Sequence, residues 1–322
     1  MKSIDEYRIK IETEIQKLEF PGGKLENLYA PIRYSLSAGG KRIRPVLTLM
    51  ASDAFGQAEE RALKAALGLE IFHNFTLLHD DVMDKSEIRR GRPTVHKKYD
   101  ENRAILSGDT MLTIASQFVS DVDNDILREV MDSFNDMAIK VYEGQQLDMD
   151  FETEEKISTE DYIEMIRCKT GALLGACGKI GALIGGVSHE DAEKMYEFGV
   201  QTGIAFQIQD DWLDTFGDAA TFGKAIGSDI NNGKKTYLYV SALESNTNTA
   251  EALREAFKIP AGDVRVKTIT RLYEKLGIKE SAVKAVNHYS SLALRALNST
   301  SLSDDKKEIF RKFAEKLIGR KK

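Results

Sequence analysis

Apolar residues recur every three or four positions along most of this chain, and polar residues fill the positions between them. The first stripe is formed by Ile4, Tyr7, Ile11, Ile15 and Leu18. A repeat close to 3.6 residues predicts amphipathic helices, each with one buried face. The chain also has only 5 prolines in 322 residues, well below the roughly 5 % of average usage. We therefore predict an all-α fold.

The breaks between the predicted helices coincide with clusters of Gly, Pro, Ser, Asn and Asp. They lie near residues 21–23, 56, 188, 245–249, 260–263 and 298–303. None of them has the length or the biased composition of a linker, so we predict one large domain over residues 1–322. The most apolar stretch, residues 171–187, is rich in glycine and contains Lys179. This composition favours a tightly packed core helix over a transmembrane helix.

Two acidic clusters with the same spacing occur in apolar, helix-like sequence. They are Asp80, Asp81 and Asp84 in LLHDDVMD, and Asp210, Asp211 and Asp214 in FQIQDDWLD. Residues four apart share one face of a helix, so each cluster would direct two carboxylates to the same side. These carboxylates repel each other unless a cation offsets their charge, and Mg²⁺ is a hard cation that prefers oxygen ligands. A solvated acidic face is the alternative, but it does not suit two copies flanked by apolar residues.

Basic residues gather next to both acidic clusters, although the formal net charge of −6 disfavours nonspecific nucleic-acid binding. The basic segments are GGKRIRP at 39–45, RRGRP at 89–93 followed by His96, FGK at 222–224, and GKKT at 233–236. Guanidinium groups and lysines bind phosphate oxygens, and adjacent glycines let the backbone approach a ligand. The GGK sequence lacks the frame of a P-loop. Surface turns also combine these residue types, but their repeated place beside carboxylates favours diphosphate binding.

Other kinds of chemistry find little support in the sequence. Cys168 and Cys177 form no CxxC motif and have no His at metal-site spacing, so we predict two buried, reduced thiols. No Ser or Cys occupies a nucleophile-elbow frame, which argues against acyl transfer. The amphipathic, acidic start lacks the continuous apolar core of a signal peptide. We expect a cytoplasmic protein without a transmembrane segment.

Taken together, the motifs resemble those of the head-to-tail trans-isoprenyl diphosphate synthases, the family of farnesyl and geranylgeranyl diphosphate synthases. The resemblance covers most of the chain and depends on the order of GGKRIRP, DDVMDKSEIRRGRPTVH, GDTMLTIA, GQQLD, KTGALL, FQIQDDWLD and FGKAIGSDINNGKKT. It implies a helical bundle around a deep central cavity, with the two aspartate motifs facing each other, and a homodimer. It also implies isopentenyl diphosphate and an allylic diphosphate (dimethylallyl, geranyl or farnesyl) as substrates. About three Mg²⁺ ions per active site are expected, held by carboxylates and substrate oxygens.

The resemblance assigns a role to each residue that matches a family motif. The implied Mg²⁺ ligands are Asp80, Asp81, Asp84 and Asp210, supported by Asp211 and Asp214. The residues implied to hold the allylic diphosphate are Arg89, Lys169, Lys224 and Lys234, and those for isopentenyl diphosphate are Lys41, Arg44, His73 and Arg90. Those near the developing cation are Thr170 and Gln207, with Gln145 and Asp148 bordering the allylic site. Released diphosphate can remove the proton from the adduct, so no protein base is expected.

The length of the product depends on how far its tail extends beside the helix that carries the first cluster. One isoprene unit is about as long as one helical turn, roughly 5 Å, so a bulky side chain upstream of Asp80 would limit the product. Phe75 lies five residues before Asp80, Phe72 lies three residues further, and Thr76 is small. Core packing is the alternative role for both phenylalanines. Within the family, an aromatic at the position of Phe75 beside an uninterrupted DDxxD resembles the geranylgeranyl (C20) type, so we favour C20 over farnesyl (C15).

Three other interpretations are compatible with a helical bundle. A terpene cyclase would share the fold and the first cluster but usually replaces the second cluster with Asn, Ser and Glu, whereas this chain has DDWLD. A noncatalytic partner subunit of a prenyl synthase commonly loses an aspartate cluster or a cationic pocket. A purely structural bundle would not bind diphosphates in a Mg²⁺-dependent manner.

Overall fold

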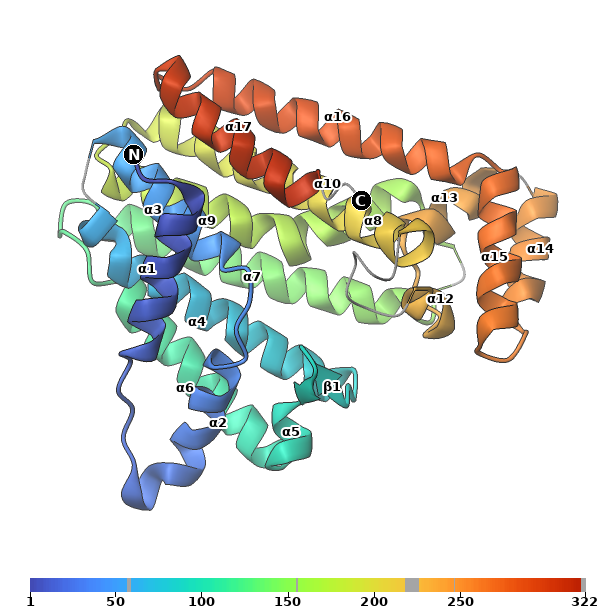
Figure 1. Cartoon of the computed structure of the whole chain (residues 1–322), viewed down its shortest axis with the longest axis horizontal. Helices are drawn as coiled ribbons and strands as arrows, with labels where there is room; N and C mark the ends of the chain where they lie inside the picture. Colours follow the sequence, from blue (N-terminus) through green and yellow to red (C-terminus); the bar gives the residue numbers. More distant parts are fainter. Residues whose placement is uncertain (57–58, 155, 218–225, 246, 320–322) are drawn as a thin grey trace. The chain divides into compact units, whose positions relative to one another are not determined.

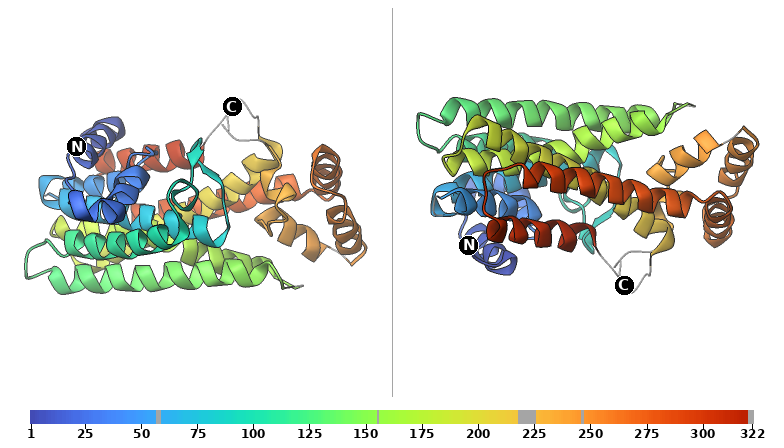
Figure 2. Two further views of the ribbon diagram at one scale, coloured as in Figure 1. Left: turned by 90° about the horizontal axis from the view of Figure 1, so that it is seen from below. Right: turned by 90° about the horizontal axis from the view of Figure 1, so that it is seen from above.

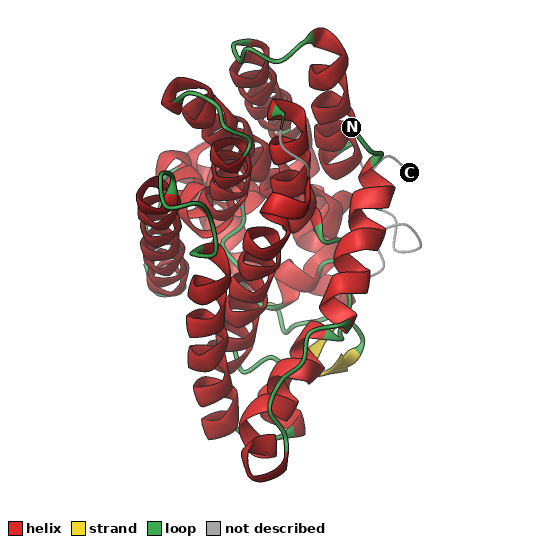
Figure 3. Ribbon diagram, turned by 90° about the vertical axis from the view of Figure 1, so that its left-hand side faces the viewer, coloured by secondary structure: helices red, strands yellow, loops and turns green. Residues whose placement is uncertain are grey.

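The computed structural model describes residues 1–322 except 57–58, 155, 218–225, 246 and 320–322. The described residues form helices joined by short connections, with one two-stranded antiparallel sheet (Figure 3). The predicted all-α fold is therefore confirmed. By their internal contacts the residues divide into two compact units. Unit 1 comprises residues 1–136, 176–195 and 301–309, and unit 2 comprises residues 137–175, 196–300 and 310–322.

Unit 1 is built around α4, a 25-residue helix that ends within the first aspartate motif. Its elements are α1 (Ile4–Gln16), η1 (Gly23–Leu25), α2 (Glu26–Leu36), α3 (Ile43–Phe55), α4 (Glu59–Met83), β1 (Ile88–Arg89), β2 (Arg92–Pro93), α5 (Val95–Lys98) and α6 (Glu101–Val119). Helix α4 lies beside α6 and also contacts α3 (Figure 1). Gly68 allows α4 and α6 to approach, because a Cβ there would lie 2.8 Å from the carbonyl oxygen of Ala115. Phe72 of α4 is fully buried, which contributes roughly 1.5–3 kcal/mol to folding.

The start of α1 shows how local sequence sets a helix boundary in unit 1. Oγ of Ser3 accepts the N–H of Glu6, and the Glu6 carboxylate accepts the N–H of Ser3, which is a capping box. From this start, Tyr7, Ile11 and Ile15 follow at four-residue spacing and are all buried. The central part of the apolar stripe predicted at the start of the chain is confirmed, whereas Ile4 is half-buried and Leu18 lies beyond the end of the helix.

Several elements lie wholly within unit 2. They are α8 (Thr159–Ile166), the π-helical turn η2 (Arg167–Gly171), α12 (Ser228–Asn231), α13 (Tyr237–Ser245), α14 (Thr247–Phe257), α15 (Asp263–Lys275) and α16 (Ile278–Asn298). Helices α13, α14 and α15, in orange in Figure 2, contact one another in chain order. Four further helices contribute residues to both units, namely α7 (Leu127–Phe151), α9 (Ala172–Ile184), α10 (His189–Phe216) and α17 (Asp304–Ile318).

Glycines allow the start of α9 to lie directly against α10 in unit 2. A Cβ on Gly203 would lie 2.8 Å from the Cα of Gly171, and one on Gly199 would lie 2.6 Å from the Cα of Gly175. Helix α9 is buried along nearly its whole length, which confirms the predicted tightly packed core helix. No helix in the described part of the chain combines the length and apolar character needed to span a bilayer.

Candidate active site

The first aspartate motif lies where α4 ends. Asp80 and Asp81 belong to the last turn of the helix, and Asp84 follows its final residue. The N–H of Asp84 still donates to the carbonyl of Asp80 at 2.8 Å, so helical geometry continues to Asp84 and both side chains share one face. Lys85 then adopts a left-handed φ of 52°. Of the three aspartates, Asp81 is buried, Asp80 is half-buried and Asp84 is exposed.

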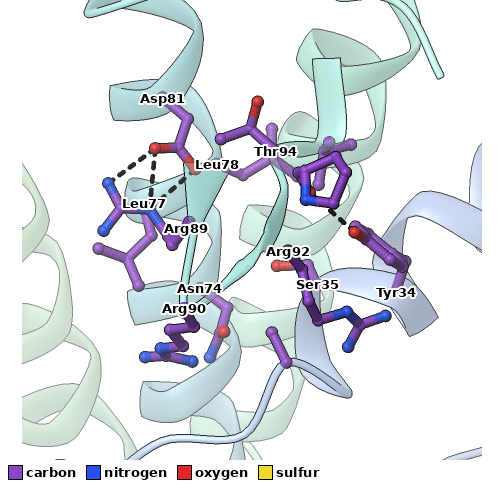
Figure 4. Close-up of a pocket in the computed structure, with 13 residues that line it drawn as sticks. Tyr34, Ser35, Asn74, Leu77, Leu78, Asp81, Arg89, Arg90, Arg92 and Thr94 are labelled. Atoms are coloured by element: carbon purple, nitrogen blue, oxygen red, sulfur yellow. Dashed lines mark hydrogen bonds and ion pairs between the residues drawn. The ribbon is translucent and has the colours of Figure 1, made fainter. Parts of the chain in front are cut away.

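Arg89 supplies a positive charge to this motif from strand β1. Its Nη2 lies 2.7 Å from Oδ1 of Asp81 and 3.4 Å from Oδ2 of Asp80. Its Nε lies 2.8 Å from both carboxylate oxygens of Asp81, and Figure 4 shows the guanidinium turned toward this side chain. Burial raises the pKa of Asp81, and Arg89 opposes this rise. Part of the repulsion that we expected a metal ion to relieve is therefore relieved by Arg89, which we had assigned only to the allylic diphosphate.

A basic cluster in unit 1 joins Arg44 of α3, His73 of α4 and Arg90 of the hairpin. Nη1 of Arg44 lies 3.1 Å from Nε2 of His73. Because a guanidinium can only donate, this imidazole is neutral, with its proton on Nδ1. Burial, followed by the charges of Arg44 and Arg90, lowers the pKa of His73 well below 6.5. Nε of Arg44 is buried and finds no acceptor among the described residues, so it can donate to an anion.

The glycines of the basic motifs hold the backbone conformation that places Arg90. Arg90 and Gly91 form the two-residue turn of the hairpin with φ of 52° and 72°, as a type I′ turn requires. Nη1 of Arg90 donates to the carbonyl of Gly39, and a Cβ on Gly40 would lie 3.0 Å from the guanidinium. We expected Gly40 to admit a ligand, but here it makes room for Arg90. Lys41, the fourth residue predicted to hold isopentenyl diphosphate, is exposed.

The second aspartate motif lies in the last two turns of α10, and protein donors occupy both oxygens of Asp211. Oδ2 accepts the Tyr162 hydroxyl at 2.5 Å and the backbone N–H of Tyr237 at 2.9 Å. Oδ1 accepts Nε2 of Gln207 at 3.2 Å. Burial and the neighbouring charge of Asp229 raise the pKa of Asp211 to about 7, although these hydrogen bonds oppose the rise. Asp211 is therefore held by the protein itself.

Asp210 and Asp214, the other two aspartates of the second motif, differ in exposure. Asp214 is buried, and its Oδ2 accepts the backbone N–H of Asp229 at 2.9 Å. Its backbone carbonyl accepts the N–H of Gly227 at 2.6 Å. Asp210 is half-buried. Asp214 therefore positions the segment that starts α12, and Asp210 is the most exposed carboxylate of this motif.

Lys169 and Thr170 lie in the π-helical turn η2 between α8 and α9. Such turns are rare and occur often at functional sites. The Lys169 ammonium pairs with Asp148 of α7, and the Thr170 hydroxyl lies 3.3 Å from Oε1 of Gln207. Four residues that the resemblance assigns to the allylic site are thus brought together within unit 2.

Helix α7 contacts this turn at Gly144, where a Cβ would lie 2.7 Å from the Cα of Lys169. The next residue, Gln145, has a buried Nε2 without an acceptor among the described residues. Its amide can therefore donate to a ligand oxygen. Lys234, also assigned to the allylic diphosphate, is exposed in the turn after α12, and Lys224 lies outside the described residues.

The proposed chain-length residues lie along α4 within unit 1. Phe72 is fully buried and Phe75 is 5 % exposed, and their rings meet edge to face at 5.5 Å. Phe75 also contacts the ring of His79 at 4.8 Å. Thr76 is half-buried, and its hydroxyl bonds to the carbonyl of His73 at 2.8 Å. This packing is compatible both with a limit on product length and with an ordinary core.

Comparison with known proteins places the chain in a family. The Polyprenyl synthetase family model matches residues 25–276, which is well over half of the sequence. The chain belongs to the polyprenyl synthetase family. The geranylgeranyl diphosphate synthase of Methanosarcina mazei is 38 % identical over 291 residues, covering 89 % of this chain and 90 % of that protein.

Solved structures agree with this family membership. A crystal structure of a geranylgeranyl pyrophosphate synthase has a TM-score of 0.94 and 39 % identity, with 100 % of both chains covered. The Corynebacterium glutamicum geranylgeranyl pyrophosphate synthase, solved with isoprenyl diphosphate and magnesium, has a TM-score of 0.87 and 27 % identity, covering 99 % of this chain and 100 % of that one. The resemblance to trans-isoprenyl diphosphate synthases is confirmed, and the polyprenyl synthetase is a trans-prenyltransferase.

The side chains of this polyprenyl synthetase suit Mg²⁺ held together with a substrate. Among the described residues, no three His, Cys, Asp or Glu side chains lie close enough to hold an ion by themselves. Mg²⁺ is usually bound by one or two carboxylates plus substrate phosphates rather than by a cage of protein ligands. Asp80 and Asp84 on one face in unit 1, and Asp210 in unit 2, are the carboxylates that fit this mode of binding.

One residue of the basic motif in the polyprenyl synthetase has a role that sequence analysis missed. Arg42 is buried in the left-handed conformation, with φ of 50°. Its Nη1 lies 2.6 Å from Oε1 of Glu70, its Nε lies 2.9 Å from Oε1 of Glu12, and its Nη2 donates to the carbonyl of Leu36 at 2.9 Å. It therefore anchors the loop before Arg44. Nothing in GGKRIRP indicates that this guanidinium alone turns inward.

Proposed function

We propose that this polyprenyl synthetase condenses isopentenyl diphosphate head-to-tail with an allylic diphosphate, and that its main product is geranylgeranyl diphosphate (C20). One observation carries the proposal: cationic side chains lie with the residues of the aspartate motif in each unit. In unit 1, Arg89 pairs with Asp80 and Asp81, and Arg89, Arg44 and Arg90 all act on His73. In unit 2, Lys169 pairs with Asp148 and precedes Thr170, which bonds to Gln207 and through it to Asp211. The relatives named geranylgeranyl synthases support C20 over the farnesyl (C15) alternative.

The reaction needs two diphosphates bound in different ways. Arg44 and Arg90, with neutral His73 as a further polar contact, would bind isopentenyl diphosphate without a metal ion, since guanidinium forks match phosphate oxygens. Arg89 and Lys169 would bind the allylic diphosphate, together with Lys234 and with Lys224 outside the described residues. Both Arg89 and Lys169 now pair with aspartates, so a bound diphosphate would compete for these cations or share them.

The chemical step follows from how charge is stabilised. The carbon–oxygen bond of the allylic diphosphate breaks, and its electron pair leaves with the diphosphate. Mg²⁺, when bound, stabilises the negative charge of that leaving group. Thr170 and Gln207 would place their oxygen dipoles near the allylic cation. The double bond of isopentenyl diphosphate then attacks the cation, and a proton passes from the adduct to the released diphosphate.

We also propose the finer features that the family implies. The chain would act as a homodimer in the cytoplasm, with each copy forming one catalytic domain around a deep cavity. Each active site would use about three Mg²⁺ ions held by carboxylates and substrate oxygens. The Corynebacterium glutamicum structure with isoprenyl diphosphate and magnesium supports this part of the proposal. Light scattering at several protein concentrations would test the dimer.

A product assay tests the proposed reaction and product length together. The purified protein would be incubated with Mg²⁺, labelled isopentenyl diphosphate and each of the dimethylallyl, geranyl and farnesyl diphosphates, and the dephosphorylated products would be sized. We expect C20 as the main product. Asp80→Asn should abolish turnover, whereas the control Asp132→Asn, which removes an exposed carboxylate paired with Arg128, should not. Cyclic hydrocarbons would indicate a terpene cyclase, and absence of any product would indicate a noncatalytic subunit.

A further inference from the structure

A continuous run of hydrogen bonds joins α8, α10 and the π-helical turn within unit 2. The phenol of Tyr162 and the backbone N–H of Tyr237 both donate to Oδ2 of Asp211, at 2.5 and 2.9 Å. Nε2 of Gln207 donates to Oδ1 of Asp211 at 3.2 Å, and Oε1 of Gln207 accepts the Thr170 hydroxyl at 3.3 Å. The run begins in the core, because Tyr162 and Asp211 are each only 3 % exposed.

With Asp211 ionised, the direction of every bond in this run is fixed by chemistry. A backbone N–H can only donate, and an ionised carboxylate can only accept. The amide of Gln207 must therefore turn its NH₂ group toward Asp211. If it turned the other way, two acceptor oxygens would face each other at 3.2 Å. Asp211 consequently decides which way the Gln207 amide points, and the amide carbonyl is left facing Thr170.

The same logic sets the orientation of the Thr170 hydroxyl. A hydroxyl carries one hydrogen and two lone pairs. Thr170 gives its hydrogen to Oε1 of Gln207, so its lone pairs point away from Gln207. Lone pairs held in one direction before the reaction stabilise a developing positive charge without the cost of reorienting during the step.

We infer that Tyr162 is a positioning residue for prenyl transfer: by holding Asp211, it fixes the amide of Gln207 and, through it, the lone pairs of Thr170 toward the allylic cation. The inference builds on the proposed function. It assigns Asp211 to the support of Gln207 rather than to direct contact with Mg²⁺. Tyr162 lies seven residues before Lys169, and nothing in its sequence context distinguishes it from an ordinary core tyrosine.

The first test is Tyr162→Phe, which keeps the ring and removes the phenolic hydrogen bond. We expect kcat to fall about tenfold, which corresponds to about 1.4 kcal/mol and lies within the net contribution of one hydrogen bond. The KM for isopentenyl diphosphate and the Mg²⁺ concentration for half-maximal activity should stay unchanged. Tyr7→Phe is the matched control, because fully buried Tyr7 also donates its hydroxyl to an aspartate, Asp53, but in unit 1. Its kcat should equal that of the wild type.

A double-mutant cycle separates positioning from general damage. If Tyr162 acts only through Thr170, Tyr162→Phe should have no further effect on kcat in a Thr170→Val background. If the two substitutions acted independently, their fold losses in kcat would instead multiply. Thermal unfolding of each variant, followed by circular dichroism, shows whether the compared proteins are folded at the assay temperature.

Asp211→Asn is a second variant, and it tests which groups donate and which accept along this run of hydrogen bonds. The N–H of Tyr237 requires an oxygen at the Oδ2 position, so the new NH₂ group would face Gln207. The Gln207 amide would then have to turn its own NH₂ group toward Thr170 and occupy the threonine lone pairs. We expect a larger fall in kcat than for Tyr162→Phe, again with an unchanged requirement for Mg²⁺. Isothermal titration with Mg²⁺ and a nonhydrolysable allylic thiolodiphosphate should show wild-type affinity.

Several results would overturn the inference. They are an unchanged kcat in Tyr162→Phe, an equal loss in Tyr7→Phe, multiplicative effects in the cycle, or weaker Mg²⁺-dependent binding of the analogue in Asp211→Asn. The last result would make Asp211 a metal ligand. If Tyr162→Phe did not fold, the kcat of Asp211→Asn and its titration would still test whether Asp211 acts by positioning Gln207. A wild-type protein that forms no prenyl product would refute the proposed function instead.

Discussion

Replacing Phe75 with alanine would test whether α4 limits the length of the product. Phe75 lies five residues before Asp80 and Phe72 lies eight residues before it, which is about 7.5 Å and about 12 Å along a helix. The difference, about 4.5 Å, is close to the length of one isoprene unit. Removing the ring of Phe75 would therefore move the limit to Phe72. We expect the main product to change from C20 to C25, one unit longer.

Phe72 should then stop further growth because it is firmly held. It is fully buried, and its ring meets that of Phe134 edge to face at 5.5 Å. The double variant with alanine at both Phe72 and Phe75 should give still longer products. The opposite change, Thr76→Phe, places a ring on the same helix at a half-buried position and should shorten the product to C15.

The assay is chromatography of the dephosphorylated products from farnesyl and labelled isopentenyl diphosphates at saturating Mg²⁺. Phe→Ala changes in a core typically cost about 3–5 kcal/mol, so a loss of stability must be separated from a change of product. Phe310→Ala is the control, since Phe310 is fully buried in unit 2 against Phe198. It should be similarly destabilised yet still make C20. If Phe75→Ala kept C20 as its main product, Phe75 would be a core residue only.

Three further predictions follow from the site. The pKa of His73 is held well below 6.5 in the folded protein, so below that pH the unfolded chain binds more protons than the folded one. The free energy of unfolding should therefore fall there by up to about 1.4 kcal/mol per pH unit. Urea unfolding at pH 5.5 and 7.5 should show a smaller loss of this free energy for His73→Gln than for the wild type, and an equal loss would contradict the prediction. Gly144→Ala should displace the turn that carries Lys169 and lower kcat/KM for the allylic substrate by up to about 100-fold. The control Gly178→Ala alters a close contact in unit 1 and should lower stability alone. Similar values of kcat/KM in the two variants would count against the prediction. A chelator should abolish turnover but leave the melting temperature unchanged, since Arg89 already offsets part of the negative charge of the first aspartate motif. A fall in melting temperature would show that the ion is needed for folding.

The helical periodicity correctly predicted that helical geometry relates Asp80 to Asp84 in the first motif. Asp80 and Asp84 share a face because four residues make about one turn, and this depends on local geometry alone. The pairing of Asp81 with Arg89 could not be predicted, because it depends on a hairpin that returns beside α4. The glycine in RRGRP gave a signal for that turn, since Gly91 adopts a positive φ. No sequence signal indicates which neighbouring guanidinium the turn directs to the aspartates.

The inward turn of Arg42 and the π-helical turn were missed for a similar reason. A buried guanidinium is stable only where partners such as Glu70 and Glu12 meet it, and these residues are distant in sequence. The wide turn at Lys169 lies where Gly144 of α7 comes close, so its form depends on tertiary contacts rather than on the letters KTG. The assigned roles of the site residues remain predictions until the variants are measured.

The wide turn between α8 and α9 also constrains how this enzyme can change during evolution. Each residue in a regular helix rotates the chain by about 100°, so losing one residue from 167–171 could restore an uninterrupted helix at little structural cost. Lys169 or Thr170 would then swing around the axis, away from Asp148 or Gln207. Selection for catalysis should therefore preserve the number of residues in this segment more strictly than most of their identities, and a survey of insertions and deletions among active synthases would reveal it.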